Sequence, residues 1–324
     1  MDTENLATSD LIDKAEQLEE AGLFTEAARI WRQVVTRRPD PISLCRLGSL
    51  LLEIGDWPEG ERAFWAATDL DKNLPEPYEG LGLLYLEVGD NKAAQDQFKR
   101  SLEIEANARR FTLLGVAQMR LDLIEVARES FGQAIDLDPS YEEASYNLAL
   151  THRDDDLAKA GRLFEKALEL DPQYASAHRE LGWVFRKLDE RDKAEFHLLR
   201  AIALDASDGW AYIYLGNLLW GNLDLSSAER FFLKATEVWP DDSTPYWCLA
   251  IFYEYTDRAR EADLFYEQAV RLNPDDPQAN LRFGLYLKET RDSAKAKIYL
   301  ERVLTLEPEN ERARSALAEI DQSR

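Results

Sequence analysis

The chain has 324 residues, with 39 Lys and Arg against 62 Asp and Glu, which gives a formal net charge of -23. A charge this negative disfavours nucleic acid as the main ligand, because phosphate binding requires a cationic face, and it disfavours anionic membrane surfaces for the same reason. The two cysteines, Cys45 and Cys248, form no CxxC motif, so neither a disulfide framework nor a zinc site is predicted.

The first residues of the sequence are not of the kind expected in a targeting signal. Residues 1–7 are acidic and lack an apolar core, so they predict a disordered N-terminus and no signal peptide. No run of about 18 apolar residues is present to span a bilayer. We therefore expect a cytoplasmic protein without a membrane partner.

From residue 8 onward, three columns of residues recur with a period of 33 or 34. The first holds small residues: Ala27, Gly60, Ala94, Ala127, Ala160, Ala194, Ala228, Ala262 and Ala296. Four residues later lies a large apolar column: Trp31, Phe64, Phe98, Phe131, Phe164, Leu198, Phe232, Tyr266 and Leu300. A second small column lies upstream: Ala15, Gly48, Gly82, Gly115, Ala149, Gly182, Gly216, Ala250 and Gly284.

These columns predict nine repeats of two packed helices. Apolar residues between the columns follow i, i+3, i+4, i+7 spacing, which is typical of amphipathic helices of roughly 14 residues. Small residues let the two helices approach closely, and the large residue one turn later fills the space beyond them. The fifth repeat differs, because Ala149 and Ala160 are 11 residues apart where the other repeats have 12, which predicts a tighter turn.

The pattern resembles the tetratricopeptide repeat over residues 8–309. The resemblance implies an all-α fold: a right-handed superhelical α-solenoid of about nine helix-turn-helix repeats. Residues 310–324 are expected to form a C-terminal capping helix and tail, with Ala313, Leu317 and Ile320 on its apolar face.

No catalytic, metal-binding or cofactor-binding motif is apparent. The three histidines show no ligand spacing, and His178 is expected in the core or at an interface. Nucleotide-binding, serine-hydrolase and metalloprotease motifs are absent from the sequence. We therefore expect a protein that is not an enzyme and uses no cofactor.

The resemblance also implies where a partner would bind. In this family the second, fifth, sixth, ninth and twelfth residues of the first helix of each repeat face a concave groove. Surplus aromatic and polar residues at or beside these places give the predicted partner-binding set: Asn147, Arg179, Trp183, Arg186, Trp210, Tyr214, Asn217, Trp220, Trp247, Ile251 and Tyr255. Exposed aromatic clusters of this kind mark binding sites. Packing of these rings on one another, or against a second copy of the chain, remains the alternative.

Charge along the predicted groove is uneven. The first three repeats place acidic residues there, and the fourth to sixth place basic ones, among them Arg109, Arg179 and Arg186. This basic stretch suits a partner segment with an acidic or carboxylate end. Asn147 and Asn217 resemble part of the clamp with which some family members hold chaperone C-termini, but the accompanying lysines are missing, so a chaperone partner is not expected.

The function predicted from the sequence is a non-catalytic adaptor or scaffold that binds another protein's peptide segment or helix in the groove. One alternative is a structural subunit of a larger assembly or homo-oligomer, using the convex face and the ends. Another is a regulatory array for an enzyme on a different chain. The sequence identifies neither the partner nor the oligomeric state.

Overall fold

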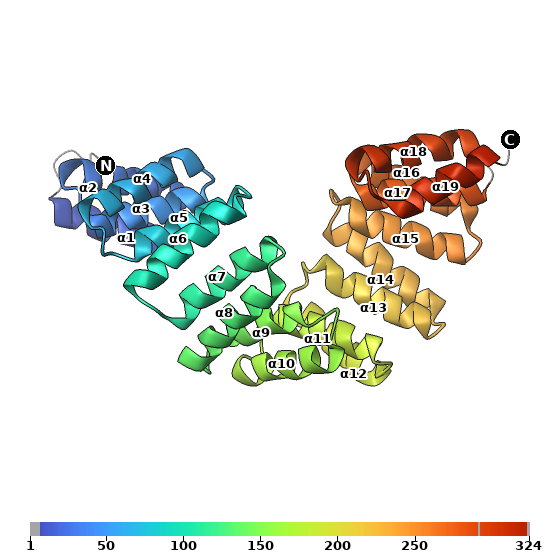
Figure 1. Ribbon diagram of the computed structural model, residues 1–324, viewed down its shortest axis with the longest axis horizontal. Coiled ribbons are helices and arrows are strands. Elements are labelled where there is room, and N and C mark those ends of the chain that lie inside the picture. Colours follow the sequence, from blue (N-terminus) through green and yellow to red (C-terminus); the bar gives the residue numbers. More distant parts are fainter. Residues whose placement is uncertain (1–6, 291, 323–324) are drawn as a thin grey trace. The chain divides into compact units, whose positions relative to one another are not determined.

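The computed structural model describes residues 7–290 and 292–322, and this part of the chain forms nineteen α-helices without any strand (Figure 1). The predicted disorder of residues 1–7 falls largely on residues outside that range. The first ten helices are α1 (Thr8–Glu20), α2 (Phe24–Arg37), α3 (Pro41–Glu53), α4 (Trp57–Leu70), α5 (Glu76–Glu87), α6 (Asn91–Ile104), α7 (Ala108–Arg120), α8 (Ile124–Leu137), α9 (Glu142–Thr151) and α10 (Leu157–Leu170). The others are α11 (Ala175–Lys187), α12 (Arg191–Leu204), α13 (Gly209–Gly221), α14 (Leu225–Val238), α15 (Ser243–Tyr255), α16 (Ala259–Leu272), α17 (Pro277–Glu289), α18 (Ser293–Leu306) and α19 (Glu311–Gln322).

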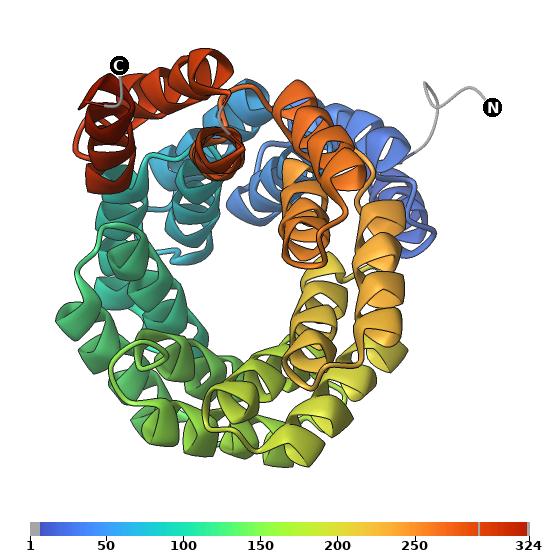
Figure 2. The ribbon, with the colours of Figure 1, turned by 90° about the vertical axis from the view of Figure 1, so that its right-hand side faces the viewer.

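The first eighteen helices form nine antiparallel pairs, each an odd-numbered first helix followed by an even-numbered second helix. Both ribbon views show the two helices of a pair running alongside each other (Figure 1 and Figure 2). First helices of successive pairs also touch directly, as α3 does with α5 and α13 with α15. The last helix, α19, packs on α17 and α18. The fold is the helical solenoid that the repeat pattern predicts.

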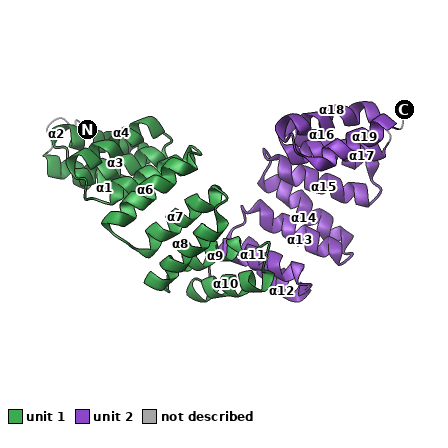
Figure 3. Ribbon diagram, in the orientation of Figure 1, with its two compact units in different colours: residues 1–171 green, residues 172–324 purple. Residues whose placement is uncertain are grey.

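The chain divides into two compact units (Figure 3). Unit 1 covers Met1–Asp171 and contains α1 to α10, and unit 2 covers Pro172–Arg324 and contains α11 to α19. Each unit has its own continuous stack of helix pairs, so each can form a binding surface from its own helices.

The three sequence columns form the core of every repeat, as predicted. All nine residues of the large column are buried, from Trp31 to Leu300, and so are their small partners. A Cβ placed on Gly82 would lie 2.4 Å from Cε1 of Phe98, well inside van der Waals contact. Glycine at this place therefore allows the aromatic ring of the second helix to lie directly against the backbone of the first helix.

The turn between the helices of a pair uses a left-handed residue at the same place in most repeats. Gly22, Gly55 and Gly89 have positive φ in the first three pairs. Non-glycine residues adopt it later: Asp122, Asp189, Leu223 and Asp257, with φ between 56° and 63°. The fifth pair has no such residue at His152 to Asp156, and its first helix, α9, has only 10 residues. The shorter spacing between Ala149 and Ala160 thus corresponds to a turn of a different conformation.

Many acidic side chains have a local structural role. Nine aspartates accept a hydrogen bond from a backbone N–H in the first turn of the helix that follows: Asp40, Asp56, Asp90, Asp156, Asp208, Asp224, Asp242, Asp276 and Asp292. An N-cap of this kind stabilises a helix by about 1 kcal/mol, and its negative charge also interacts favourably with the helix dipole. Part of the net negative charge therefore stabilises helix ends.

Candidate functional site

The predicted partner-binding residues lie on first helices, and all but one belong to unit 2. Asn147 is on α9 in unit 1, where its amide donates to the carbonyl oxygen of Glu143 at 2.8 Å. The remaining ten lie on three successive first helices: Arg179, Trp183 and Arg186 on α11, Trp210, Tyr214, Asn217 and Trp220 on α13, and Trp247, Ile251 and Tyr255 on α15. Because α13 touches both α11 and α15, the structure brings these ten residues onto one stack of helices.

Four aromatic residues of this set form two groups, which lie at opposite ends of α13. Near its start, the Trp210 ring lies 5.6 Å from that of Tyr214 and 6.1 Å from that of Trp239. Near its end, the Trp220 ring lies 5.0 Å from that of Tyr255 and 5.7 Å from that of Phe252. Ten helical residues separate the two groups, which corresponds to about 15 Å along the axis. Each tryptophan packs on neighbouring rings yet stays only half-buried, so part of each ring can still contact a partner.

Two of the predicted basic residues differ sharply in their surroundings. The Arg179 guanidinium donates to Asp208 at 2.7 Å and to Glu180 at 3.0 Å, and both carboxylates are nearly buried. Its charge is therefore already compensated within unit 2. Arg186, the penultimate residue of α11, forms no ion pair with a described residue, and burial lowers the pKa of its guanidinium against a smaller opposite effect of Tyr214.

Unit 2 contains three solvent-shielded side-chain nitrogens without a hydrogen-bond partner among the described residues. They are Nε of Arg186, Nε1 of Trp247 and Nε of Arg282. All three are N–H donors, and all three belong to first helices, α11, α15 and α17. A shielded donor that lacks an acceptor costs about 1–3 kcal/mol, so its recurrence on one set of helices requires a reason.

A pocket of about 410 Å³ joins several of these features at the C-terminal end of unit 2. Three predicted residues, Trp220, Ile251 and Tyr255, line it together with Arg282 and Arg312. Neither arginine forms an ion pair with a residue in the described part of the chain. The pocket wall also includes Tyr266, whose hydroxyl donates to the Glu254 carboxylate at 2.7 Å.

Arg282 and Arg312 were not among the binding residues predicted from the sequence. Arg282 is the sixth residue of α17, which is a groove position under the same partition that selected the tryptophans, but the residues chosen stopped at the eighth repeat. Arg312 is an exposed residue of α19, the capping helix. Extending the partition to the ninth repeat would have found Arg282. No comparable signal pointed to Arg312.

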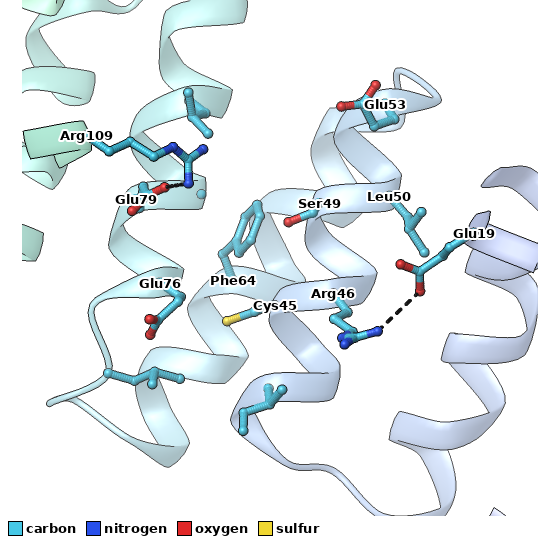
Figure 4. Close-up of a pocket in the computed structure, with 14 residues that line it drawn as sticks. Glu19, Cys45, Arg46, Ser49, Leu50, Glu53, Phe64, Glu76, Glu79 and Arg109 are labelled. Atoms are coloured by element: carbon cyan, nitrogen blue, oxygen red, sulfur yellow. Dashed lines mark ion pairs between the residues drawn. The ribbon is translucent and has the colours of Figure 1, made fainter. Parts of the chain in front are cut away.

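A second and larger pocket lies within unit 1 (Figure 4). It has a volume of about 540 Å³ and is formed by α1, α3, α5 and α7, with Phe64 from α4 at its floor. Its acidic wall residues Glu19, Glu53, Glu76 and Glu79 were expected at the groove, but the pocket itself was not predicted.

The described residues hold no group of three or more His, Cys, Asp or Glu side chains placed to bind a metal ion. His178, expected in the core or at an interface, is buried, and its Nδ1 lies 2.8 Å from Nδ1 of His197. Within the residues that the structure describes, no helix has the length and apolar character needed to cross a bilayer.

Comparison with known proteins identifies the repeat. Family models of the tetratricopeptide repeat match residues 75–107, 112–175, 246–276 and 277–310, which together make up half of the chain. The chain belongs to the tetratricopeptide repeat family. Tetratricopeptide repeat proteins generally mediate protein–protein interactions and are typically non-catalytic. No match was found among curated proteins.

Solved structures of tetratricopeptide repeat proteins are similar in fold. The crystal structure of yeast Tom70 is 15% identical with a TM-score of 0.60, covering 98% of this chain and 88% of that one. A tetratricopeptide repeat protein from Parabacteroides merdae is 17% identical with a TM-score of 0.62, covering 76% and 98%. The pilF protein of Pseudomonas aeruginosa is 18% identical with a TM-score of 0.52, covering 69% and 99%. At these identities the likeness concerns the fold alone.

Proposed function

We propose that this tetratricopeptide repeat protein is a non-catalytic adaptor that binds an acidic segment of a partner protein on the first helices of unit 2. The observation that carries the proposal is the set of three shielded donors, on Arg186, Trp247 and Arg282, that lack an acceptor in the described chain. Carboxylates and backbone carbonyls of an extended segment are acceptors, and they would satisfy these donors once a side-chain movement exposes the shielded nitrogens.

The charges of unit 2 support an acidic partner. In a chain with a net charge of -23, carboxylates are abundant, so an arginine is expected to form an ion pair, as Arg179 does with Asp208. Arg186, Arg282 and Arg312 nonetheless form no ion pair within the described residues. The half-buried rings of Trp220 and Trp247 lie on the same helices and supply the aromatic contact area that binding hot spots commonly use.

The test uses substitutions that remove the N–H donors of Arg282 and Trp247 but keep much of the side-chain packing. Arg282→Met retains the aliphatic stem, and Trp247→Phe retains an aromatic ring. Each removes an unsatisfied N–H, so the melting temperature is expected to hold or to rise, while affinity for the partner falls. Twelve-residue phage-displayed segments selected on the wild-type chain provide the ligand. Selected segments should be rich in Asp and Glu, and binding to the double variant should weaken about tenfold or more.

A matched control removes similar groups from second helices. Leu264 and Arg260 are exposed on α16, so Leu264→Ala with Arg260→Gln should leave affinity at the wild-type level. Selected segments without acidic residues, or equal binding by the wild type and the donor variant, would refute the proposal.

A second candidate function is that of a structural subunit, and exposed apolar side chains on second helices of unit 2 favour it. Phe196, Leu264 and Ile298 are 63%, 61% and 63% exposed, and they lie at the same repeat position on α12, α16 and α18. Such a row is typical of an association surface. A molar mass from light scattering that stays at that of a monomer over a hundredfold range of concentration would contradict self-assembly.

A further inference from the structure

The pocket of unit 1 has an apolar floor between charged walls. Cys45 and Leu50 from α3, Leu83 from α5 and the ring edge of Phe64 line its base. Gly80 on α5 keeps this base open, because a Cβ there would lie 2.2 Å from Cε1 of Phe64 and would displace the ring. The volume of about 540 Å³ is in the range of pockets that hold a ligand group or several side chains.

The cations of the pocket are already bound to carboxylates. Arg109 contacts Glu79 at 2.5 Å, and Arg46 contacts Glu16 at 2.9 Å and Glu19 at 4.0 Å. Figure 4 shows the Arg109–Glu79 and Arg46–Glu19 pairs on opposite sides, with Phe64 and Cys45 between them. Neither arginine is therefore available to an anionic ligand without breaking an existing pair.

The acidic residues of the pocket are in excess. Four carboxylates and two guanidiniums line it, so the lining has a net charge of -2. Glu53 is exposed and has no ion pair within the described residues, and Glu76, half exposed, contacts Arg110 only at 3.5 Å. In Figure 4 these two carboxylates lie on opposite sides of Phe64.

The thiol in the pocket is an apolar wall group. Burial, and to a lesser extent the negative charges of Glu76 and Asp40, raise the pKa of Cys45 to about 12. The thiol thus stays protonated at neutral pH, which removes thiolate nucleophilicity and metal ligation from its roles. The smaller contribution, from the negative charges of Glu76 and Asp40, has the sign that attracts a cation.

From this arrangement we propose that the unit 1 pocket is a second binding site, which takes a segment of a partner protein with apolar side chains flanked by lysine or arginine. The apolar side chains occupy the base over Phe64 and Cys45, and the flanking cations pair with Glu53 and Glu76. This charge preference is the reverse of that proposed for unit 2, and the inference depends on unit 1 alone. An adaptor with both sites would hold an acidic and a basic segment at the same time.

The experiment uses the full chain and labelled eight-residue peptides, with binding followed by fluorescence anisotropy. The first peptide has a central Leu-Phe pair between two lysines, the second replaces the lysines with glutamates, and the third replaces the Leu-Phe pair with glycines. We expect saturable binding of the first peptide, and binding at least about tenfold weaker for each of the other two.

Two variants and a matched control test the location. Glu53→Gln with Glu76→Gln should weaken the first peptide about tenfold, since two partly desolvated ion pairs are lost. Ser49→Trp, at an exposed position that lines the pocket, should abolish binding while leaving the charges unchanged. Glu129→Gln with Glu165→Gln removes the same charge from exposed places on α8 and α10 and should have no effect.

Three results would overturn the inference. One is the absence of saturable binding of the first peptide at up to about 1 mM. Another is equal binding of the glycine peptide, which would reveal only general attraction to a chain of charge -23. The third is unchanged affinity in both pocket variants. The Arg282→Met and Trp247→Phe variant should bind the basic peptide normally, so the failure of either proposal is distinguishable from failure of the other.

Discussion

The buried guanidinium of Arg110 in unit 1 offers a quantitative test of how the first helices are held together. This side chain is 5% exposed, and three carboxylates surround it. Its Nε lies 3.1 Å from Glu79, its Nη1 lies 2.6 Å from Glu105 and its Nη2 lies 3.5 Å from Glu76. Glu79 comes from α5 and Arg110 from α7, so the pair joins the first helices of successive repeats.

Replacing Arg110 with methionine keeps the volume and removes the charge. The Glu79 side chain, 11% exposed, then keeps only Arg109 as a cationic partner, whereas Glu105 and Glu76 are exposed enough to be rehydrated. Breaking a buried ion pair from one side costs about 3–5 kcal/mol. Because Glu79 keeps one cationic partner, we expect the free energy of unfolding to decrease by about 3 kcal/mol, the lower end of this range.

Urea unfolding followed by far-UV circular dichroism measures the loss. Because repeat arrays open locally, hydrogen exchange of α5 to α7 should show where it occurs. The double variant Arg110→Met with Glu79→Met removes both charges, and we expect its free energy of unfolding to lie within about 1 kcal/mol of that of the wild type. Arg109→Met, at a side chain that is 58% exposed, should cost less than about 1 kcal/mol. A double variant no more stable than Arg110→Met alone would refute this reasoning.

Two further predictions concern unit 2. Gly182→Leu should destabilise the protein by about 1–3 kcal/mol, because the first added carbon would already lie 2.7 Å from Cγ of Leu198. An unchanged melting temperature would contradict the alignment of the columns. Acidification should also destabilise unit 2: burial, with a smaller effect of His178, lowers the pKa of His197 from 6.5 to about 4. As the pH drops, the unfolded state therefore takes up a proton before the folded state does. The free energy of unfolding falls as the pH drops below about 6.5 and levels off near 4. The total decrease is roughly 1–2 kcal/mol after allowance for partial exposure. Replacing both histidines with phenylalanine should flatten this part of the pH profile of urea midpoints, and a slope that persists would assign the effect to other groups.

In its neutral form the histidine pair has a defined pattern of donors and acceptors. Nε2 of His178 lies 3.3 Å from the carbonyl oxygen of Pro172, which can only accept, so Nε2 donates. In neutral His178 its Nδ1 is then an acceptor for the N–H on Nδ1 of His197. Uptake of a proton by His178 at Nδ1 would place two N–H groups face to face at 2.8 Å.

The sequence predicted the core of each repeat because its determinants are local. A small residue and a large one four positions later, repeated with a fixed period, suffice to define two packed helices, and Phe98 against Gly82 shows the outcome. The tighter turn of the fifth repeat was visible for the same reason. Its effect on the backbone, the loss of the left-handed residue, required the structure.

The binding surfaces were harder to predict because they depend on long side chains and distant neighbours. Arg179 looked available in sequence, but its guanidinium reaches Asp208 on the next repeat. The unit 1 pocket depends on the absence of a side chain at Gly80, next to a ring from the preceding repeat. Neither feature follows from the residue type at a groove position, since the decisive partner belongs to a neighbouring repeat.

The left-handed turn residues suggest how this protein could be made more robust without changing what it recognises. Leu223, with a φ of 63°, is 72% exposed and lies between α13 and α14, away from the residues that line either pocket. An L-residue with a side chain beyond Cβ in this conformation costs about 1 kcal/mol, which glycine avoids. Glycine at Leu223 and at the equivalent Asp122, Asp189 and Asp257 would relieve this strain at the edge of each repeat. At these turns stability can therefore be adjusted without touching a residue that lines either pocket.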